Sequence, residues 1–230
     1  MTLLDIKELC KKSTLENTGD TYNLVGQFWR WCSYPITWIF MPTRMTPNMI
    51  SFLSLIFAVV GFVILVLPLN NEFCWKVVGI TGFSIWAILD CVDGNIARIK
   101  KQFSCNGDLW DAAAGYCAMS LMFLGMSAIV GKNEFLTLYE SLILGGLTSI
   151  FSLYSRLLMH FKYGNNENEV GNKSGYSLLM RVVFNIVSPD ALVIPFMYIA
   201  NFFDIEWMFV IGYFILYSLE CLYASYKLLR

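Results

Sequence analysis

The chain has 230 residues, of which 57% are hydrophobic and only 14% are charged, and its formal net charge is −1. Soluble domains carry about 25% charged residues, so the composition excludes a soluble globular protein and predicts one all-α integral membrane domain over residues 1–230. The seven cysteines show no CxxC or zinc-finger spacing, which excludes a zinc-finger protein and indicates small packing residues. We expect a lipid bilayer around the protein and no nucleic acid as a partner.

Residues 1–47 are expected to form a cytoplasmic and interfacial N-terminal segment. Its first 20 residues are polar and lack the apolar stretch of a signal peptide, so we expect none. Residues 22–42 are rich in aromatic side chains but are interrupted by Gly26 and Pro35. This pattern favours a helix lying in the headgroup layer, and a seventh span is the alternative.

Six segments are apolar enough to cross a bilayer, which takes about 20 mostly apolar residues. They are residues 48–68, 76–97, 108–131, 136–160, 181–202 and 206–227. Pro47 precedes the first segment, where a proline suits the opening turn of a helix. The sequence therefore predicts a six-helix transmembrane bundle over residues 48–227.

Basic residues alternate between the two sides of this predicted bundle. All lysines and arginines except Lys76 and Lys132 fall in the N-terminal region, the second or fourth connection with its flanks, or the C-terminus. Cytoplasmic segments of membrane proteins carry the excess of lysine and arginine. The distribution therefore predicts that both termini, and the connection between the second and third helices, lie in the cytoplasm.

Three acidic residues stand in or beside the apolar segments next to that connection. Asp90 and Asp93 are three residues apart and share one helix face, and Asp111 lies near the start of the following helix. The short connection is expected to make the two helices antiparallel neighbours, so the three carboxylates converge. Carboxylates gathered in a poor solvent repel one another unless a cation holds them, and oxygen ligands suit Mg²⁺ or Mn²⁺ bound together with substrate phosphates. We therefore predict a divalent-metal site on these aspartates.

Small and basic residues beside the aspartates fit a phosphate ligand. Gly94 and Gly107 lack a Cβ and would let a nucleotide diphosphate approach the backbone. Ala97 follows Asp93 by one turn and Asp90 by two, and Arg98 would supply positive charge near the pyrophosphate. Small residues also pack helices, and basic residues also mark the cytoplasmic face. We favour nucleotide binding for these four residues and the simpler interpretation for the two lysines that follow Arg98.

The spacing D-x2-D-G-x2-A-R-x8-G-x3-D, from Asp90 to Asp111, resembles the signature of the CDP-alcohol phosphatidyltransferase family. Thr46-Pro47-Asn48 also resembles the opening of the first helix in that family. The resemblance implies six membrane helices, a two-metal site between the second and third, and a homodimer. It further implies transfer of a substituted phosphoryl group from CDP-diacylglycerol or another CDP-alcohol to an acceptor alcohol with release of CMP, as in phospholipid biosynthesis.

The family signature continues with x3-D, and this chain has Gly115 at that position. In the family the fourth aspartate shares the metals and is thought to take the proton of the acceptor hydroxyl. Three interpretations stay open. In the first, Asp108, on the same helix face as Asp111, replaces the missing base. In the second, the acceptor is activated by the metal and needs no protein base. In the third, the chain binds nucleotide and metal without turnover. Asp108 and Asp111 are thus the catalytic candidates, although the helix dipole alone also favours acids at a helix start.

Two further arginines are candidates for binding an anionic group of the acceptor. Arg156 lies near the cytoplasmic end of the fourth predicted helix, and Arg181 lies at the start of the fifth. An arginine that snorkels to the interface is an equally good interpretation of Arg156. Gly145, with Gly146 and Ser149, could form a close helix contact, and a dimer face is one hypothesis for it.

A small transporter with a carboxylate-lined path is the competing class of function. Such a path would place acids across the membrane, whereas the three aspartates gather at one predicted edge. The sequence also shows no sign of the inverted repeats on which many transporters are built. The pattern therefore favours the phosphotransferase over a transporter.

Overall fold

The computed structural model describes residues 5–8, 10, 24–67, 72–102, 107–130, 135–163 and 192–229, and within these ranges it contains helices and no strands. The helices are α2 (Leu24–Phe40), α3 (Pro47–Val66), α4 (Glu72–Lys100), α5 (Gly107–Ile129), α6 (Leu138–Tyr163), α9 (Ile194–Phe202) and α10 (Glu206–Leu229). The predicted all-α class is confirmed for this part of the chain.

Five of these helices, α3, α4, α5, α6 and α10, are long and apolar enough to cross a membrane, so the chain is an integral membrane protein. They correspond to five of the six predicted spans, with ends shifted by a few residues. The predicted span 181–202 begins outside the described residues, and α9 is its only described helix. The count of six spans therefore stays a prediction.

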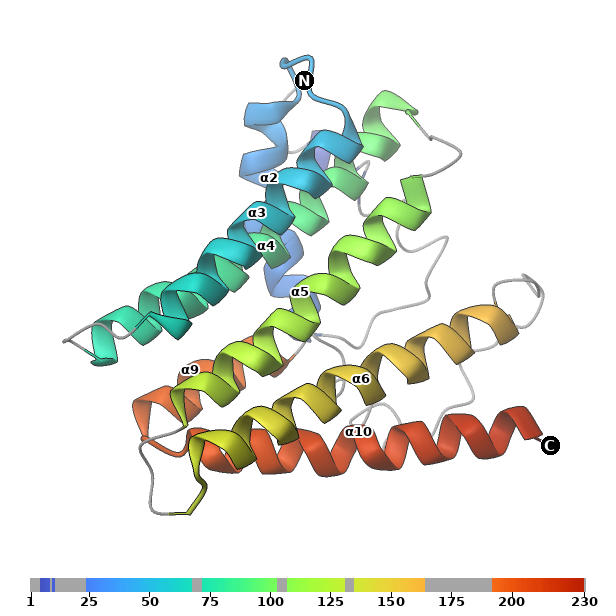
Figure 1. Ribbon diagram of the computed structural model, residues 1–230. Helices are drawn as coiled ribbons and strands as arrows, with labels where there is room; N and C mark the ends of the chain where they lie inside the picture. The colour runs from blue at the N-terminus through green and yellow to red at the C-terminus, as the bar shows by residue number, and fades with distance from the viewer. Residues whose placement is uncertain are drawn as a thin grey trace.

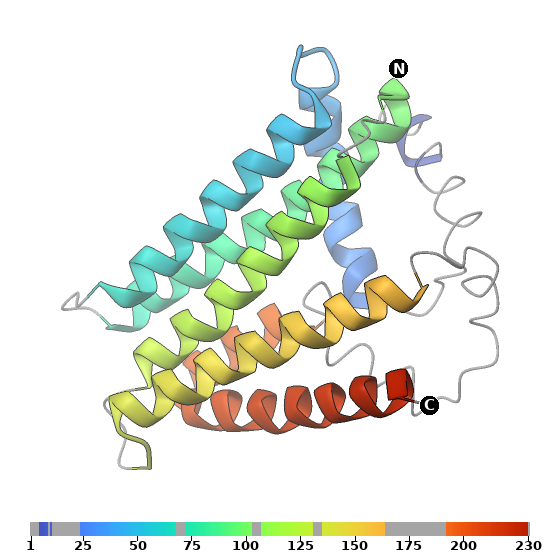
Figure 2. The ribbon, with the colours of Figure 1, turned by 45° about the vertical axis from the view of Figure 1, so that its right-hand side comes forward.

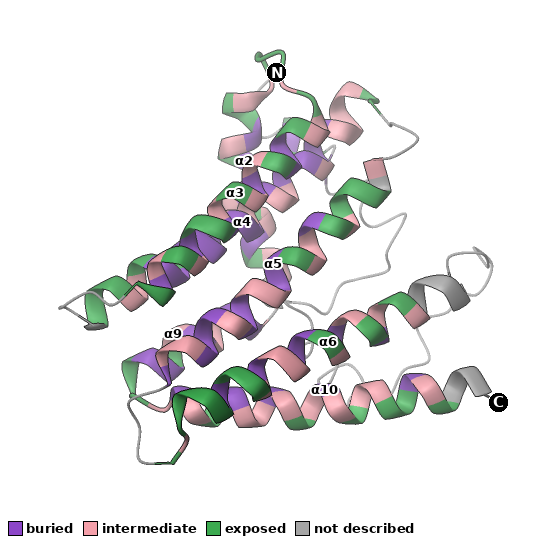
Figure 3. Ribbon diagram, in the orientation of Figure 1, coloured by how far each residue is buried: buried purple, intermediate pink, exposed green. Residues whose placement is uncertain are grey.

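The helices form two groups. In Figures 1 and 2, α3, α4 and α5 run side by side, and α6 and α10 form a second pair. The groups meet where α5 ends and α6 and α10 begin, and they diverge toward the start of α5 and the end of α6 (Figure 1). Exposed positions follow the outer sides of α3 and α6 (Figure 3). They include Phe52, Ile56 and Ile143, which suits surfaces that face lipid tails.

Helix α2 packs on the C-terminal half of α4 and is not among the candidate spans. It continues through Pro35, whose missing N–H removes one helical hydrogen bond. Trp31 and Trp38 are exposed, at 60% and 52%, whereas Ser33 and Thr37 are completely buried. The helix therefore has an aromatic outer face and a small polar face that is buried against α4, and its position in the headgroup layer stays a prediction.

Helices α3 and α4 touch through their backbones at glycines. A Cβ placed on Gly82 would lie 2.7 Å from the Cα of Gly61 and 2.9 Å from the carbonyl oxygen of Phe57. A Cβ placed on Gly61 would lie 2.6 Å from the carbonyl oxygen of Gly79. Real Cβ atoms essentially never come this close, so only glycine allows this approach. The contact matters for the site, because it fixes how α3 lies along α4.

We expect Gly82→Ala to destabilise the fold, although alanine is the better helix former by about 1 kcal/mol. Overpacking of backbone against backbone typically costs about 1–3 kcal/mol, which outweighs that gain. Thermal unfolding of the detergent-purified protein measures the effect. The matched control is Gly212→Ala in α10, where a Cβ would meet no atom within 4 Å. Equal melting temperatures for the two variants would contradict the glycine contact.

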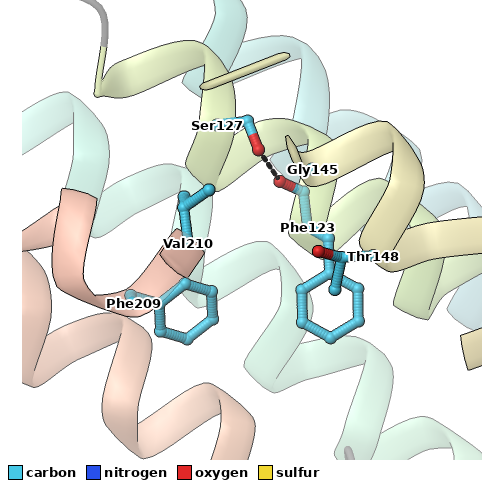
Figure 4. Close-up of a pocket in the computed structure, with 6 residues that line it drawn as sticks. All are labelled: Phe123, Ser127, Gly145, Thr148, Phe209 and Val210. Atoms are coloured by element: carbon cyan, nitrogen blue, oxygen red, sulfur yellow. Dashed lines mark hydrogen bonds between the residues drawn. The ribbon is translucent and has the colours of Figure 1, made fainter. Parts of the chain in front are cut away.

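Gly145 and Ser149 do form a close helix contact, and they form it within the chain, between α6 and α5. A Cβ on Gly145 would lie 3.0 Å from the carbonyl oxygen of Phe123, and the Ser149 hydroxyl donates to the carbonyl oxygen of Ser120 at 3.2 Å. Figure 4 shows Gly145 facing Ser127 beside a shallow hollow. The hollow is lined by Phe123, Ser127, Gly145, Thr148, Phe209 and Val210. It is a packing feature of α5, α6 and α10.

Candidate active site

Three carboxylates meet where α4 ends and α5 begins. Ligand oxygens of Asp90, Asp93 and Asp111 all lie within 4.8 Å of one another. Asp93 is buried, Asp90 is half-buried and Asp111 is exposed. We call these three residues the aspartate cluster. It is open on the side of α5, so a ligand from outside the chain can reach it.

The cluster forms although α4 and α5 touch over only a short stretch. Helix α3 packs along both of them and is the main neighbour of each. The expectation that a short connection makes α4 and α5 packed neighbours is therefore correct only locally. The carboxylates still converge, because α3 holds the two helices in a fixed relation.

Ser51 of α3 holds the buried member of the cluster. Its hydroxyl donates to Oδ2 of Asp93 at 2.5 Å, and Ser51 is itself only 5% exposed. This hydrogen bond fixes the rotation of the Asp93 carboxylate. Ser51 could not be predicted from the sequence, since a serine among apolar residues carries no signal of its own and only the packing of α3 on α4 brings it to Asp93.

We expect Ser51→Ala to lower the affinity of the cluster for a divalent cation by about tenfold, because the partners that orient a metal ligand typically contribute 10- to 100-fold. Titration with Mn²⁺, followed by electron paramagnetic resonance, measures this affinity. Ser54→Ala is the matched control, since Ser54 is also fully buried on α3 but donates only to the backbone carbonyl of Ser51. An unchanged Mn²⁺ affinity in Ser51→Ala would show that Asp93 needs no such support.

Gly94 precedes Arg98 by one turn of α4, and the side chain of Arg98 lies over it. A Cβ on Gly94 would come within 3.3 Å of Nη2 of Arg98 and 3.7 Å of its Cζ. The missing side chain thus makes room for the guanidinium, a role of Gly94 that the sequence alone did not indicate. The Nε of Arg98 is buried without a hydrogen-bond partner in the described part of the chain. An unsatisfied buried donor costs about 1–3 kcal/mol, so an anion or water that reached this nitrogen would bind favourably.

A second polar residue of α4, Asn95, supports Arg98 and was also missed from the sequence. Its Oδ1 accepts a hydrogen bond from Nη2 of Arg98 at 3.1 Å. Its Nδ2 donates to Ser33 and Thr37 of α2 at 3.0 and 3.2 Å. An amide within the signature was the one available signal, and Asn95 is 3% exposed.

Ala97 and Lys100, at the end of α4, form hydrogen bonds that involve backbone groups. The carbonyl of Ala97 accepts from the backbone N–H of Gln102 at 3.1 Å where α4 ends. Lys100 donates to the carbonyls of Thr43 and Met45 at 2.8 and 3.2 Å and so ties the turn before α3 to the end of α4. Its role is structural, in keeping with the simpler interpretation of this lysine.

The first turn of α5 contains the remaining candidates. Gly107 is the first residue of the helix and Asp108 is the second, with a side chain that lies outside the described part. Gly115 is one turn beyond Asp111, and a Cβ on it would meet no atom within 4 Å. The position of the missing fourth aspartate is therefore open space.

The two acceptor candidates are only partly described. Arg156 lies in α6, close enough to Glu220 of α10 for their charges to attract. The Oε2 atom of Glu220 is buried without a hydrogen-bond partner among the described residues. Arg181 lies outside the described residues. Acceptor binding by these arginines stays a prediction.

A family model of the CDP-alcohol phosphatidyltransferases matches residues 44–216, which includes α3, α4, α5 and the whole aspartate cluster. The chain belongs to the CDP-alcohol phosphatidyltransferase family. Comparison with individual curated proteins gives no match. This family is a class of membrane phosphotransferases, in keeping with the five apolar helices of the chain.

The aspartate cluster fits the divalent metal that CDP-alcohol phosphatidyltransferases generally use. Three carboxylates this close repel one another when ionised, and a divalent cation removes that repulsion. The donors are all oxygens, which suit a hard cation such as Mg²⁺ or Mn²⁺. Within the described residues, no other group of three or more His, Cys, Asp or Glu side chains could hold a metal.

Proposed function

We propose that this protein transfers a substituted phosphoryl group from a CDP-linked donor to an acceptor alcohol and releases CMP, as in phospholipid biosynthesis. The observation that carries the proposal is the convergence of Asp90, Asp93 and Asp111, in a chain of this family, within 4.8 Å of one another. The donor is CDP-diacylglycerol or another CDP-alcohol.

The aspartate cluster is proposed to hold Mg²⁺ or Mn²⁺, with Ser51 orienting the Asp93 carboxylate. When bound, the cation would neutralise the carboxylates and offset the charge of the donor pyrophosphate. Arg98 is proposed to hydrogen-bond the pyrophosphate, because its guanidinium is held by Asn95, lies near enough to Asp93 for their charges to attract, and phosphate oxygens accept strongly from arginine. The backbone at Ala97 and Gly107 is proposed to lie against the nucleotide, whereas the space at Gly94 is taken by the Arg98 guanidinium.

A group other than residue 115 must accept the proton of the acceptor hydroxyl, since Gly115 has no side chain that could act as a base. Asp108 is the proposed base. It precedes Asp111 by one turn on the same face of α5. Arg156 and Arg181 are proposed to bind an anionic group of the acceptor and hold its hydroxyl toward the cluster.

The proposed orientation follows from charge. The basic residues that flank the helices favour six spans, with both termini and the aspartate cluster on the cytoplasmic side. A water-soluble acceptor would then reach the cluster from the cytoplasm. The proposed assembly is a homodimer, as the family resemblance implies.

CMP release tests the proposed reaction. Membranes containing the protein are incubated with radiolabelled CDP-diacylglycerol and a mixture of candidate alcohols, with Mg²⁺ or Mn²⁺. We expect CMP and a new phosphodiester to appear, to stop when EDTA removes the metal, and to resume when Mn²⁺ is returned. Repeating the assay with soluble CDP-alcohols and diacylglycerol distinguishes the two donor classes.

A nucleotide-binding scaffold without turnover is the second candidate, and Gly115 is the observation that favours it. Such a scaffold would bind CDP in a metal-dependent manner and release no CMP with any donor or acceptor. Binding of neither metal nor CDP would reject both candidates and leave the transporter.

A further inference from the structure

A chain of hydrogen bonds joins α2 to the arginine of the signature. Ser33 and Thr37 are completely buried and accept hydrogen bonds from Nδ2 of Asn95 at 3.0 and 3.2 Å. Oδ1 of Asn95 accepts from Nη2 of Arg98 at 3.1 Å. Both N–H groups and the oxygen of the amide are therefore used, in a residue that is 3% exposed.

The two hydroxyls fix which way the amide faces. The Ser33 hydroxyl donates its proton to the carbonyl of Arg30 at 2.8 Å, and the Thr37 hydroxyl donates to the carbonyl of Ser33 at 2.8 Å. A hydroxyl has one proton, so each can only accept from Asn95. A reversed amide would present its oxygen to two hydroxyls without free protons and its N–H groups to the guanidinium. Asn95 is thus held with its oxygen toward Arg98.

The guanidinium of Arg98 is confined on two sides by these contacts. Gly94 leaves the space in which it lies, 3.3 Å from where a Cβ would stand, and Asn95 fixes one of its terminal nitrogens. An arginine that is fixed before its ligand arrives loses less conformational entropy on binding. Lys and Arg side chains are otherwise among the most mobile in a protein.

We propose that Asn95 is a positioning residue that aims Arg98 at the pyrophosphate of the CDP-linked donor, and that α2 sets this aim through Ser33 and Thr37. The proposal rests on the proposed function, since it takes Arg98 as a donor-binding residue. It gives α2 a role in the reaction without any contact between α2 and the substrate.

The test compares affinities for CDP and for Mn²⁺ in the full chain, purified in lipid nanodiscs. Asn95→Leu keeps the size of the side chain and removes the acceptor. We expect its dissociation constant for CDP, in the presence of Mn²⁺, to rise about three- to tenfold, the effect of leaving one long side chain to be ordered on binding. The dissociation constant for Mn²⁺ alone is expected to stay unchanged, because Asn95 does not touch the aspartate cluster.

Variants of Ser33 and Thr37 on α2 test the same chain of hydrogen bonds from the end opposite to Arg98. The double variant Ser33→Ala with Thr37→Val is expected to weaken CDP binding as Asn95→Leu does, whereas Thr37→Ser keeps a hydroxyl and is expected to bind like the wild type. Ser84→Ala is the control for the loss of a buried hydroxyl on α4 away from α2; its hydroxyl meets Tyr198 at 3.0 Å.

The possible results separate this proposal from the function on which it rests. A wild-type protein that binds no CDP would reject the proposed function. Wild-type binding with unchanged CDP affinity in Asn95→Leu and in the α2 double variant would reject the positioning role alone. A parallel loss of Mn²⁺ and CDP affinity would also overturn it, because Asn95 would then only maintain the fold. If Asn95→Leu does not fold, the α2 double variant decides.

Discussion

Replacing Gly115 by aspartate is expected to raise the rate of CMP release, by at most the roughly 10²–10⁴-fold that a general base typically contributes, because Asp108, the proposed base, stands two turns of α5 away from position 115. Position 115 follows Asp111 by one turn of α5, so the new carboxylate would lie on the same face as the aspartate cluster. A Cβ there meets no atom within 4 Å, so the backbone leaves room for a side chain to start. The variant would complete the signature of the family.

Gly115→Ala is the control for this gain. It adds the same Cβ without a carboxylate, and it stabilises the helix by about 1 kcal/mol because alanine is the better helix former. We expect its rate to equal that of the wild type. A rate in Gly115→Asp that stays at the wild-type level would mean that the acceptor proton already has an efficient acceptor, such as Asp108. If neither protein releases CMP, the scaffold becomes the better description.

Asp93→Asn is expected to abolish metal-dependent CMP release, a loss larger than the effect of removing a general base. The substitution keeps the size of the side chain and an oxygen that can accept from Ser51, so α3 and α4 should pack as before. It removes the charge from the buried member of the cluster, and a neutral amide is a much weaker ligand for Mg²⁺ than a carboxylate. The assay is CMP release together with Mn²⁺ titration.

Asp204→Asn is the control for that loss. Asp204 lies in the turn between α9 and α10 with a φ of 53°, a left-handed conformation that asparagine also tolerates. Its replacement should change neither the rate nor the Mn²⁺ affinity. Substantial turnover in Asp93→Asn, at any Mg²⁺ concentration, would remove the main support for the proposed metal site.

Much of the architecture could be read from local properties of the chain. Hydropathy is averaged over about 20 residues, which is the length that crosses a bilayer, so the spans behind α3, α4, α5, α6 and α10 were predicted to within a few residues. The convergence of Asp90, Asp93 and Asp111 was also predicted, because a three-residue spacing and a short connection leave few alternatives.

The residues that orient the cluster could not be found in this way. Ser51 lies 42 positions before Asp93, and Ser33 lies 62 positions before Asn95. Such pairs form only when two helices pack at a particular position along their axes and with a particular rotation of each helix about its axis. The crossing of α3 with α4 that brings Ser51 to Asp93 depends on the backbone contact of Gly61 with Gly82, which has no counterpart in hydropathy.

The sequence by itself thus determined the membrane class, most of the helices and the acidic signature, because each depends on neighbours a few residues away. Only the tertiary structure decided which side chains hold the signature in place and which small residues leave space. Gly94 makes room for a guanidinium, Gly145 packs against α5 within the chain, and Gly115 stands at an open position. What each of these three glycines lies beside is visible only in the folded chain.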